Sequence, residues 1–273
     1  MTGAMVNGIH IHYEVHGSSE PLLLIMGLGA NATAWEMQIP AFSREFQVIA
    51  FDNRGAGRSD KPSGAYSISL LADDAAALLD ELGIGAAHVF GMSMGGMIAQ
   101  ELVLRHPERV KTLVLGATMC GGPNAIMAGP QMIQQWISAA ALPLEQAIET
   151  GLTFLYSEEF LADNKQWLMK RSFELSSLMP PPHALQSQVI AVLGFNAYDR
   201  LQRVQVPTLV LTGTKDKIIP AANSRILAGR IASARLEEFP GSGHGFLVEN
   251  AEEINQAVLG FLRPFKSQSF GPK

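Results

Sequence analysis

The sequence predicts an α/β protein with a mostly parallel, doubly wound sheet and an inserted helical cap. Short apolar runs alternate with helical patterns over most of the chain, and several of these runs are apolar without interruption. Uninterrupted apolar runs are typical of parallel strands that are covered on both faces. Strand–helix alternation then favours a doubly wound sheet. The alternation stops between residues 121 and 199, which indicates an insertion.

The individual elements follow from local patterns. The first strand alternates apolar and polar residues and is therefore expected to be half exposed, whereas the later strands are continuous apolar runs. The first long helix has apolar residues at helical spacing and ends at Gly83. We expect strands at 9–15, 22–26, 48–51, 87–90, 111–115, 208–211 and 234–239, and helices at 68–82, 95–105, 222–231 and 252–262.

The segment 121–199 has no strong strand signal. It is rich in Leu, Met, Gln and Ala and is broken by Pro180-Pro181-Pro182. We interpret it as a helical cap between two strands of the sheet. The predicted organisation is a core domain formed by residues 1–120 and 200–273, with a cap at 121–199.

Composition excludes several classes of protein. Of the 273 residues, 47% are hydrophobic and 16% are charged, which is the opposite of a disordered chain. The net charge of −5, without a basic cluster, argues against nucleic acid or an anionic membrane as a partner. The single Cys120 cannot form an internal disulfide. We see no signal peptide and no apolar run long enough to span a bilayer, so a soluble cytoplasmic protein is expected.

The residues Gly91-Met92-Ser93-Met94-Gly95 match the pattern G-x-S-x-G. The pattern alone is weak, because a plain glycine-rich turn with a capping serine would also match it. Here it follows a predicted strand and opens a predicted helix, which is the setting of a nucleophile elbow. In such a turn the Ser93 hydroxyl projects at the carboxyl edge of the sheet.

A serine nucleophile needs a base, and the base needs an orienting acid. Asp216 and His244 each lie on a loop after a predicted strand, where such groups are expected. The chain order Ser, Asp, His differs from the orders of trypsin and subtilisin. The rival acids are Asp73 and Asp74 on a helix and Asp199 near the end of the insertion.

These motifs together resemble the α/β-hydrolase family over nearly the full chain. Residues 52–59, Asp-Asn-Arg-Gly-Ala-Gly-Arg-Ser, are similar to the family's D-x-R-G-x-G-x-S turn, and Gly27-Leu28-Gly29 resembles its oxyanion loop. The small serine esterases and 3-oxoadipate enol-lactonases are the branch that we suggest. Met26 departs from the pattern, because many relatives have a histidine there whose hydrogen bonds methionine cannot make. The support of this loop must therefore differ.

The resemblance implies an oxyanion hole formed by the backbone N–H groups of Leu28 and Met94. It also implies that the cap faces the substrate, and its Met and Leu content suggests an adaptable apolar pocket. Among the cap cations, Lys165, Lys170 and Arg171 are interpreted as a solvated helix face. We expect substrate contacts at Gly27, Met119, Trp136, Leu142 and Phe246.

The predicted function is hydrolysis of small to medium, largely apolar carboxylic esters through an acyl-enzyme. No cofactor is expected. A metal site is not expected either, although the spacing of His10, His12 and His16 could mimic one. The alternatives are a 3-oxoadipate enol-lactonase-like lactone hydrolase, a carbon–carbon bond hydrolase and a ligand receptor on the same fold. The partner would be a small-molecule ester, and the protein a monomer or homodimer.

Overall fold

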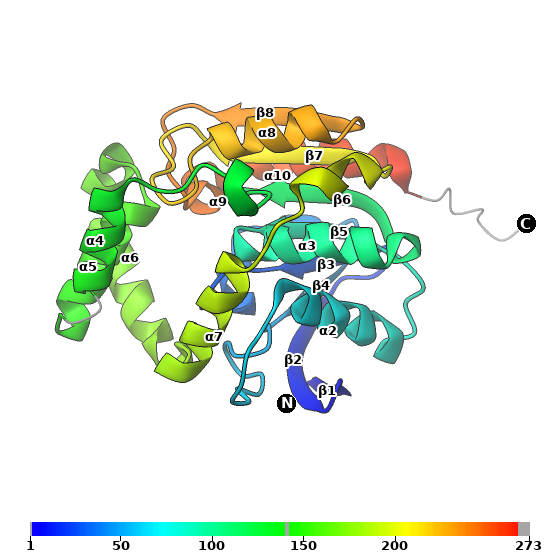
Figure 1. The fold of residues 1–273 in the computed structure, drawn as a ribbon, viewed down its shortest axis with the longest axis horizontal. Coiled ribbons are helices and arrows are strands. Elements are labelled where there is room, and N and C mark those ends of the chain that lie inside the picture. The colour runs from blue at the N-terminus through cyan, green and yellow to red at the C-terminus, as the bar shows by residue number, and fades with distance from the viewer. Residues whose placement is uncertain (1, 140–141, 267–273) are drawn as a thin grey trace, which may run out of the picture.

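The computed structural model describes residues 2–139 and 142–266, and within these the chain forms an eight-stranded sheet (Figure 1). The strand order is β1-β2-β4-β3-β5-β6-β7-β8. Strands β3 to β8 run parallel, while β1 and β2 are antiparallel to their neighbours. The predicted α/β class with a mostly parallel sheet is therefore confirmed.

The expected strands all form, with bounds that differ by a few residues. The inner strands β5 and β6 are buried along almost their whole length, as their uninterrupted apolar sequences predict. The bounds are β1 Gly3–Val6, β2 Ile9–His16, β3 Pro21–Ile25, β4 Gln47–Phe51, β5 Ala87–Met92, β6 Val110–Gly116, β7 Thr208–Gly213 and β8 Ala234–Phe239.

Strand β1 is not predicted by the sequence pattern. It has four residues, of which alternate ones are exposed, and it pairs only with β2 at the edge of the sheet. A run this short carries too little periodicity to be separated from a loop by sequence alone. Its strand state depends on hydrogen bonds to β2, such as those in the register Gly3 opposite His12.

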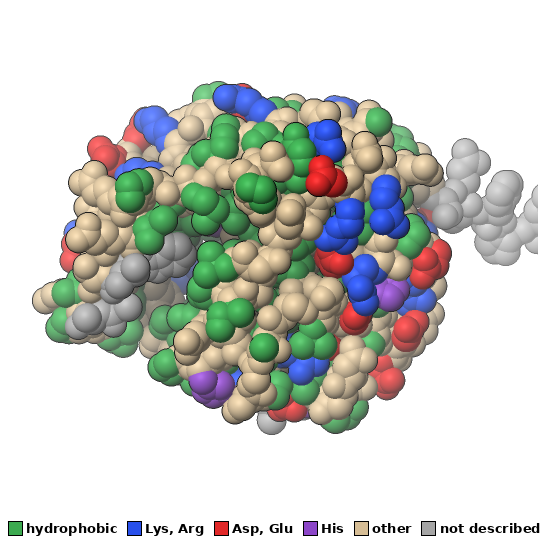
Figure 2. All heavy atoms as spheres, viewed as in Figure 1, with side chains coloured by type: hydrophobic (Ala, Val, Ile, Leu, Met, Phe, Trp, Pro, Cys, Tyr) green, Lys and Arg blue, Asp and Glu red, His purple; other side chains and the backbone are tan. Residues whose placement is uncertain are grey.

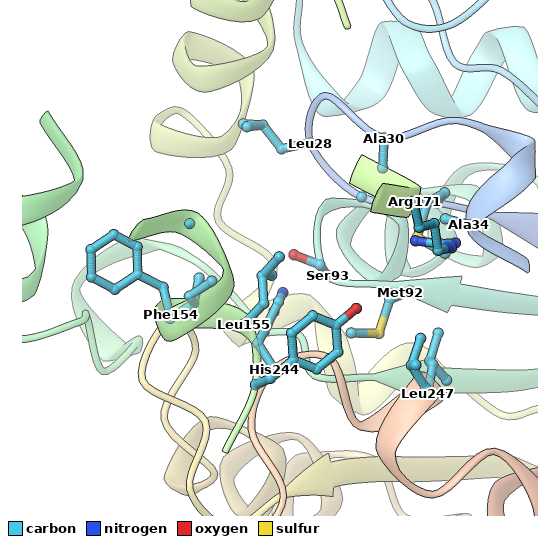
Figure 3. A pocket seen from close by; sticks show the side chains of 17 residues that line it. Leu28, Ala30, Ala34, Met92, Ser93, Phe154, Leu155, Arg171, His244 and Leu247 are labelled. Carbon is cyan, nitrogen blue, oxygen red and sulfur yellow. The ribbon is translucent and has the colours of Figure 1, made fainter. Parts of the chain in front are cut away.

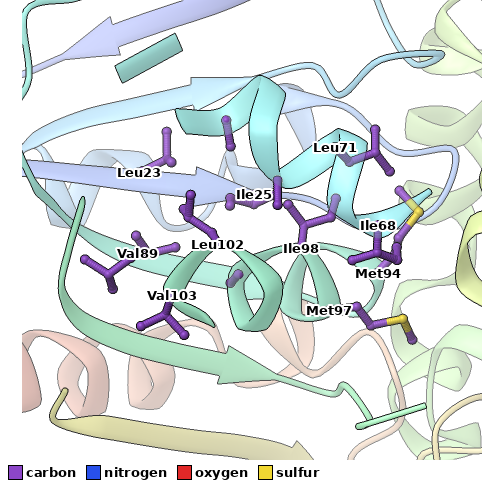
Figure 4. Packing of buried hydrophobic residues seen from close by; sticks show 14 of the residues in the cluster. Leu23, Ile25, Ile68, Leu71, Val89, Met94, Met97, Ile98, Leu102 and Val103 are labelled. Atoms are coloured by element: carbon purple, nitrogen blue, oxygen red, sulfur yellow. The ribbon is translucent and has the colours of Figure 1, made fainter. Parts of the chain in front are cut away.

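Helices cover both faces of the sheet. On one face lie α2 (Ile68–Glu81), α3 (Met94–Arg105) and α8 (Ala222–Arg230), whose apolar residues share a buried cluster with Leu23, Ile25 and Val89 (Figure 4). The opposite face is covered by α1 (Ile39–Phe42) and α10 (Ala251–Leu262) in a second cluster. Two apolar faces of one sheet explain why the strands lack polar alternation.

Between β6 and β7 the described chain has helices and no strand, as the sequence predicts. The helices α4 (Pro130–Ala139), α5 (Leu144–Leu155) and α6 (Glu158–Leu175) gather at one side of the sheet in Figure 1, and α7 (Pro182–Leu193) leads back to it. An isolated bridge between Gly121 and Asn196 joins the two ends of this insertion. We keep the division into a core and a cap at 121–199 as a proposal.

The surface carries its charge unevenly. On the face in Figure 2, acidic and basic side chains concentrate on the side away from the inserted helices, while the middle of this face is largely apolar or uncharged. Among the described residues, no helix is both long and apolar enough to cross a membrane.

Candidate active site

Ser93 occupies a strained turn between β5 and α3. Its φ of 56° and ψ of −121° lie outside the regions that L-residues usually adopt. The Ser93 N–H donates to the Gly116 carbonyl at 2.8 Å, and the Thr118 hydroxyl donates to the Ser93 carbonyl at 2.7 Å. Strain of this kind persists only where surrounding contacts over-determine it, and it clusters at functional sites.

The glycines of the motif permit the close approach of strand and helix. A Cβ at Gly95 would lie 2.0 Å from the Ile25 carbonyl oxygen, and one at Gly91 would lie 2.2 Å from the Gly95 carbonyl oxygen. Neither distance is possible for real atoms without a shift of the backbone. The pattern G-x-S-x-G is therefore required here by packing as well as by the turn.

Asp216 and His244 form a buried pair at the same edge of the sheet. His244 Nδ1 lies 2.7 Å from Asp216 Oδ2, and Asp216 Oδ1 accepts from the backbone N–H groups of Ile218 and Ile219, both at 2.8 Å. A carboxylate is an acceptor only, so this contact places the proton on Nδ1. The other ring nitrogen, Nε2, is then free to accept a proton.

Ser93 and His244 line one cavity. Figure 3 shows a ring nitrogen of His244 directed toward the Ser93 hydroxyl. The loops after β7 and β8 thus carry the acid and the base to the end of β5, because the carboxyl ends of parallel strands meet at one edge of the sheet. Ser93, His244 and Asp216 thus lie together at this edge, and their roles as nucleophile, base and acid stay a prediction.

The three other candidate acids bind other side chains or lie outside the cavity of Ser93. Asp74 accepts two hydrogen bonds from Arg54, at 2.7 and 2.9 Å, in a buried ion pair. Asp73 pairs with Arg105 and His106 on the outer side of α2 and α3. Asp199 is an exposed residue of the short 3-10 helix Tyr198–Arg203. None of the three reaches the cavity of Ser93.

The loop after β3 is held by side chains from two distant segments. Asn53 donates to the Met26 carbonyl at 2.8 Å, while Gln188 accepts from the Gly29 N–H at 2.9 Å and donates to the Arg54 carbonyl at 2.8 Å. These bonds provide support that does not depend on a histidine at position 26. Gln188 belongs to α7, so the insertion itself braces this loop.

Two backbone donors border the Ser93 hydroxyl. Met94 is the first residue of α3, so its N–H has no acceptor within the helix. Among the described residues, the N–H of Leu28 also has no hydrogen-bond acceptor. Their participation in an oxyanion hole remains a proposal.

The cavity has a volume of about 400 Å³ and lies between the sheet edge and the insertion. Its wall is mainly apolar, with contributions from the loop after β3, from α5 and from the short helix α9 (Phe246–Glu249). The Gly245 N–H donates to the Leu155 carbonyl at 2.6 Å and so ties α5 to the histidine loop. The polar side chains on the wall are those of Ser93, Tyr156, Arg171 and His244.

The residues expected to contact the substrate lie in different places. Gly27 lines the cavity, but Met119 and Phe246 lie in the two buried clusters of the core. Phe246 points away because its ring packs on Phe239 at 5.6 Å.

Leu142 borders a different, shallow hollow between α4 and α5, and the side chain of Trp136 lies outside the described part of the structure. Met119, Leu142 and Phe246 are thus not among the residues that line this cavity, and their contact with a substrate stays a prediction.

The sequence analysis does not identify two polar residues that line the cavity. Arg171 is expected on a solvated helix face, yet it lines the cavity and its side chain is only 17% exposed. Tyr156 follows directly after α5 and is buried against the histidine loop. No spacing signal in the sequence separates these two positions from their neighbours.

The described residues contain no group of three or more His, Cys, Asp or Glu side chains that could hold a metal ion. His12 and His16 both approach Glu14, with Nε2 to carboxylate distances of 3.5 and 3.3 Å. These contacts lie within β2, where His12 is buried and Glu14 and His16 are half-buried.

A family model of the alpha/beta hydrolase fold matches residues 20–251. The chain belongs to the α/β-hydrolase family. The match covers the turn that presents Ser93, both loops that carry Asp216 and His244, and the whole insertion between β6 and β7.

This α/β-hydrolase is similar to proteins of several names. A RutD protein of Azorhizobium caulinodans, whose name describes a carbamate hydrolase, is 33% identical over 251 residues, covering 92% of this chain and 94% of the relative. The 3-oxoadipate enol-lactonase 2 of Acinetobacter baylyi is 30% identical over 263 residues, covering 94% of each. A solved enol-lactonase of Burkholderia xenovorans LB400 superposes with a TM-score of 0.84 at 27% identity, covering 96% of this chain and 100% of that one.

Proposed function

We propose that this α/β-hydrolase is a serine esterase that cleaves small to medium, largely apolar carboxylic esters. The observation that carries the proposal is the strained Ser93 at the same cavity as His244, whose Nδ1 is held by Asp216 at 2.7 Å. A nucleophile, a base and an orienting acid within one site are the requirements of acyl transfer.

In the proposed reaction the Ser93 hydroxyl attacks the ester carbonyl, and His244 Nε2 accepts its proton. Collapse of the tetrahedral intermediate expels the alcohol, which takes that proton from His244 and leaves Ser93 acylated. A water molecule then attacks the acyl group while His244 again acts as base, which releases the acid and restores Ser93. Asp216 stabilises the imidazolium in both steps and keeps the ring oriented.

The backbone N–H groups of Leu28 and Met94 are proposed to stabilise the oxyanion of both intermediates. Removal of one donor from a comparable oxyanion hole costs about 2.7–4 kcal/mol of transition-state stabilisation. Backbone donors are well suited to this role because they need no reorganisation during the reaction. The brace that Gln188 and Asn53 provide supports the required position of Leu28.

The cavity supports a preference for small or medium substrates with apolar parts. Its volume of about 400 Å³ is near the lower end of the range for small-molecule sites. Met26, Leu28, Met92, Phe154, Leu155 and Leu247 provide apolar surface around the reacting atoms.

The first test is hydrolysis of a series of p-nitrophenyl esters from acetate to long acyl chains. We expect turnover of short and medium chains and a loss of at least about 10³-fold in kcat in Ser93→Ala. The fold of the variant is checked by its melting temperature. Turnover that persists in Ser93→Ala would rule out Ser93 as the nucleophile.

Hydrolysis of a lactone is the second candidate, and the enol-lactonases among the similar proteins favour it. The same nucleophile, base and acid would open a lactone through an acyl-enzyme whose leaving alcohol stays attached. An enol-lactone or simple lactone is therefore assayed beside the open-chain esters. A folded protein that opens lactones but cleaves no ester of the series would replace the first proposal by this one.

The two remaining alternatives have weaker support. Carbon–carbon bond hydrolases of this fold usually carry H-G-x-G-P-G in the oxyanion loop, which residues 26–30 do not match. A receptor role would leave the full set of nucleophile, base and acid unexplained. Slow single acylation without turnover on either substrate class would favour the receptor.

A further inference from the structure

The wall of the active-site cavity contains a cation that is only partly neutralised. Arg171 on α6 uses its Nε to bind the carboxylate of Glu36, and the guanidinium lies 6.0 Å from the centre of the Trp167 ring. Its Nη2 is buried and has no hydrogen-bond partner among the described residues. One edge of the guanidinium is therefore anchored and Nη2 is enclosed by protein. Among the described residues Nη1 is neither hydrogen-bonded nor enclosed, so it is the donor left for a ligand in the cavity.

Tyr156 provides a second donor on the same wall. Its ring is held tightly, since a Cβ at Gly245 would lie 2.4 Å from it, and it stacks on Phe160 at 5.6 Å. Within the described part of the chain, no partner is found for its hydroxyl. Burial raises the pKa of Tyr156 to about 12, although the nearby Arg171 lowers it, so the phenol keeps its proton and can donate.

The neighbouring acids cannot satisfy these donors. Glu36 is engaged at Nε of Arg171 and is itself 42% exposed. Glu249 accepts from the Ser157 hydroxyl at 2.6 Å, from the Ser157 N–H at 3.2 Å and from the Gly243 N–H at 2.8 Å. The remaining wall around Arg171, including Ala30, Ala34 and Met26, is apolar and has no side-chain acceptor.

Nη1 of Arg171 and the Tyr156 hydroxyl are donors without an acceptor among the described residues, and neither is sealed from the cavity, so a bound acceptor can use both. A carboxylate suits this pair, because its oxygens accept charge-assisted hydrogen bonds from a guanidinium and can also accept from a phenol. In the view of Figure 3, Ser93 and His244 lie between Phe154 on one side and Arg171 with Ala34 on the other. A substrate that spans the cavity could thus reach Ser93 and Arg171 at once.

We propose that the natural substrate is an ester or lactone that carries a carboxylate, which Arg171 and Tyr156 hold while Ser93 attacks the carbonyl. This inference rests on the proposed function and narrows its substrate class. It changes the expectation of a wholly apolar substrate, because one end of the molecule would be anionic. Arg171 would then determine specificity and would not take part in proton transfer.

The test compares esters that differ only in charge. One pair is p-nitrophenyl hemiglutarate and its neutral methyl ester, with the carboxylate on the acyl side. The other is the butyrate ester of 3-hydroxypropanoate and the methyl ester of that compound, with the carboxylate on the alcohol side. We expect kcat/KM of the native enzyme to favour the anionic member of at least one pair by about tenfold or more, mainly through KM.

Two variants of α6 complete the design. Arg171→Met is expected to lower the anionic-to-neutral ratio of kcat/KM by about tenfold or more. Lys170→Met is the matched control, because Lys170 is the adjacent cation, is 78% exposed and pairs only with Glu174. Its ratio should equal that of the native enzyme.

A third variant tests the phenol. Tyr156→Phe removes the hydroxyl alone and is expected to reduce the anionic-to-neutral ratio of kcat/KM by about threefold to tenfold.

The outcomes separate this inference from the proposed function. Ser93-dependent hydrolysis without preference for the anionic member of either pair, or a preference that Arg171→Met leaves intact, would overturn the inference and leave the esterase proposal standing. If Arg171→Met does not fold, calorimetry on Ser93→Ala, which keeps Arg171 and Tyr156 but lacks the proposed nucleophile, decides. Monomethyl glutarate should bind at least about tenfold more tightly than dimethyl glutarate, and equal or weaker binding would contradict the inference.

Discussion

At the scale of single residues, the site is determined by steric limits that leave few choices. Ser93 has a positive φ of 56° although it is not a glycine, and the glycines at positions 91 and 95 leave no room for a side chain. The turn thereby places Ser93 at the end of β5, beside the cavity. This local requirement is why a pattern of five contiguous residues is enough to predict a candidate nucleophile.

Substitution of Gly95 by alanine tests this steric argument. The new methyl group would lie 2.0 Å from the Ile25 carbonyl oxygen, so strand and helix must separate. We expect Gly95→Ala to lower the free energy of unfolding by about 1–3 kcal/mol or more and to reduce ester hydrolysis strongly. Urea unfolding and kcat measure the two effects.

Gly260→Ala is the matched control. Gly260 lies in α10, and nothing lies within 4 Å of a Cβ built there. Because alanine is the better helix former, we expect this variant to gain up to about 1 kcal/mol of stability. A Gly95→Ala protein as stable and active as the native one would contradict the close approach of β5, α3 and β3.

At the scale of secondary-structure elements, the site depends on contacts between segments that are far apart in sequence. Gln188 on α7 joins the loop after β3 to the turn after β4. Its side-chain amide accepts from the Gly29 N–H and donates to the Arg54 carbonyl. The turn itself is held by Asp52, which accepts from the N–H groups of Ala32 and Arg58 at 2.7 Å each. Helix α7, a part of the insertion, therefore also stabilises the loop after β3.

We predict that Gln188→Met weakens this brace. Methionine has a similar length but cannot accept from the Gly29 N–H or donate to the Arg54 carbonyl. Each buried group left without a partner costs about 1–3 kcal/mol of stability. If the loop also loses the position of its oxyanion donor, kcat falls by about tenfold or more with a smaller change in KM.

The neighbouring Val189 supplies the control for this variant. It is 38% exposed, so Val189→Ala on the same helix should alter neither kcat nor the melting temperature appreciably. A Gln188→Met enzyme with native kcat and lowered stability would mean that Gln188 is structural only. Native values for both quantities would remove the proposed brace altogether.

At the scale of the whole molecule, stability is linked to pH through a buried histidine between two strands of the sheet. His88 on β5 contacts the Thr112 hydroxyl on β6 at 2.8 Å and Glu20 at 3.2 Å, and its ring packs edge-on against Phe46. Burial lowers the pKa of His88 below its usual 6.5, although the hydrogen bond with Glu20 acts to raise it. The folded protein therefore binds this proton less readily than the unfolded chain.

Because the unfolded chain takes up the proton first, folding stability is lost as pH falls below about 6.5. Equilibrium unfolding between pH 7 and pH 5 should show this decrease, and His88→Gln should make the curve flatter over that window. A second loss is expected below about pH 4.5. Its source is Asp73: burial raises the pKa of Asp73, but hydrogen bonds from Arg105 and His106 lower it further, so the folded pKa lies below the usual 3.8 and stability is lost as pH falls through that range. Constant stability of the native protein from pH 7 to pH 5 would refute the assignment to His88.

The class of fold and the turn that presents Ser93 can be predicted from local sequence alone, as can the chain order of the proposed nucleophile, acid and base. Each of these is written in contiguous residues: uninterrupted apolar strands, glycines at fixed offsets, and loops that directly follow a strand. The short edge strand β1 escaped because its pairing with β2, and not its own pattern, makes it a strand.

Which side chains line the cavity depends on packing between segments that are distant in the sequence. Met119 and Phe246 follow strands or loops near the site, yet packing turned them into the core, while Arg171 was turned from an expected solvent face to the cavity wall. The direction of a side chain on an inserted helix depends on how that helix docks against elements more than a hundred residues away, such as Glu36 for Arg171 and Gly29 for Gln188. Local residue spacing carries no information on such docking. The proposed nucleophile can therefore be predicted from the sequence, whereas the side chains that line the cavity cannot.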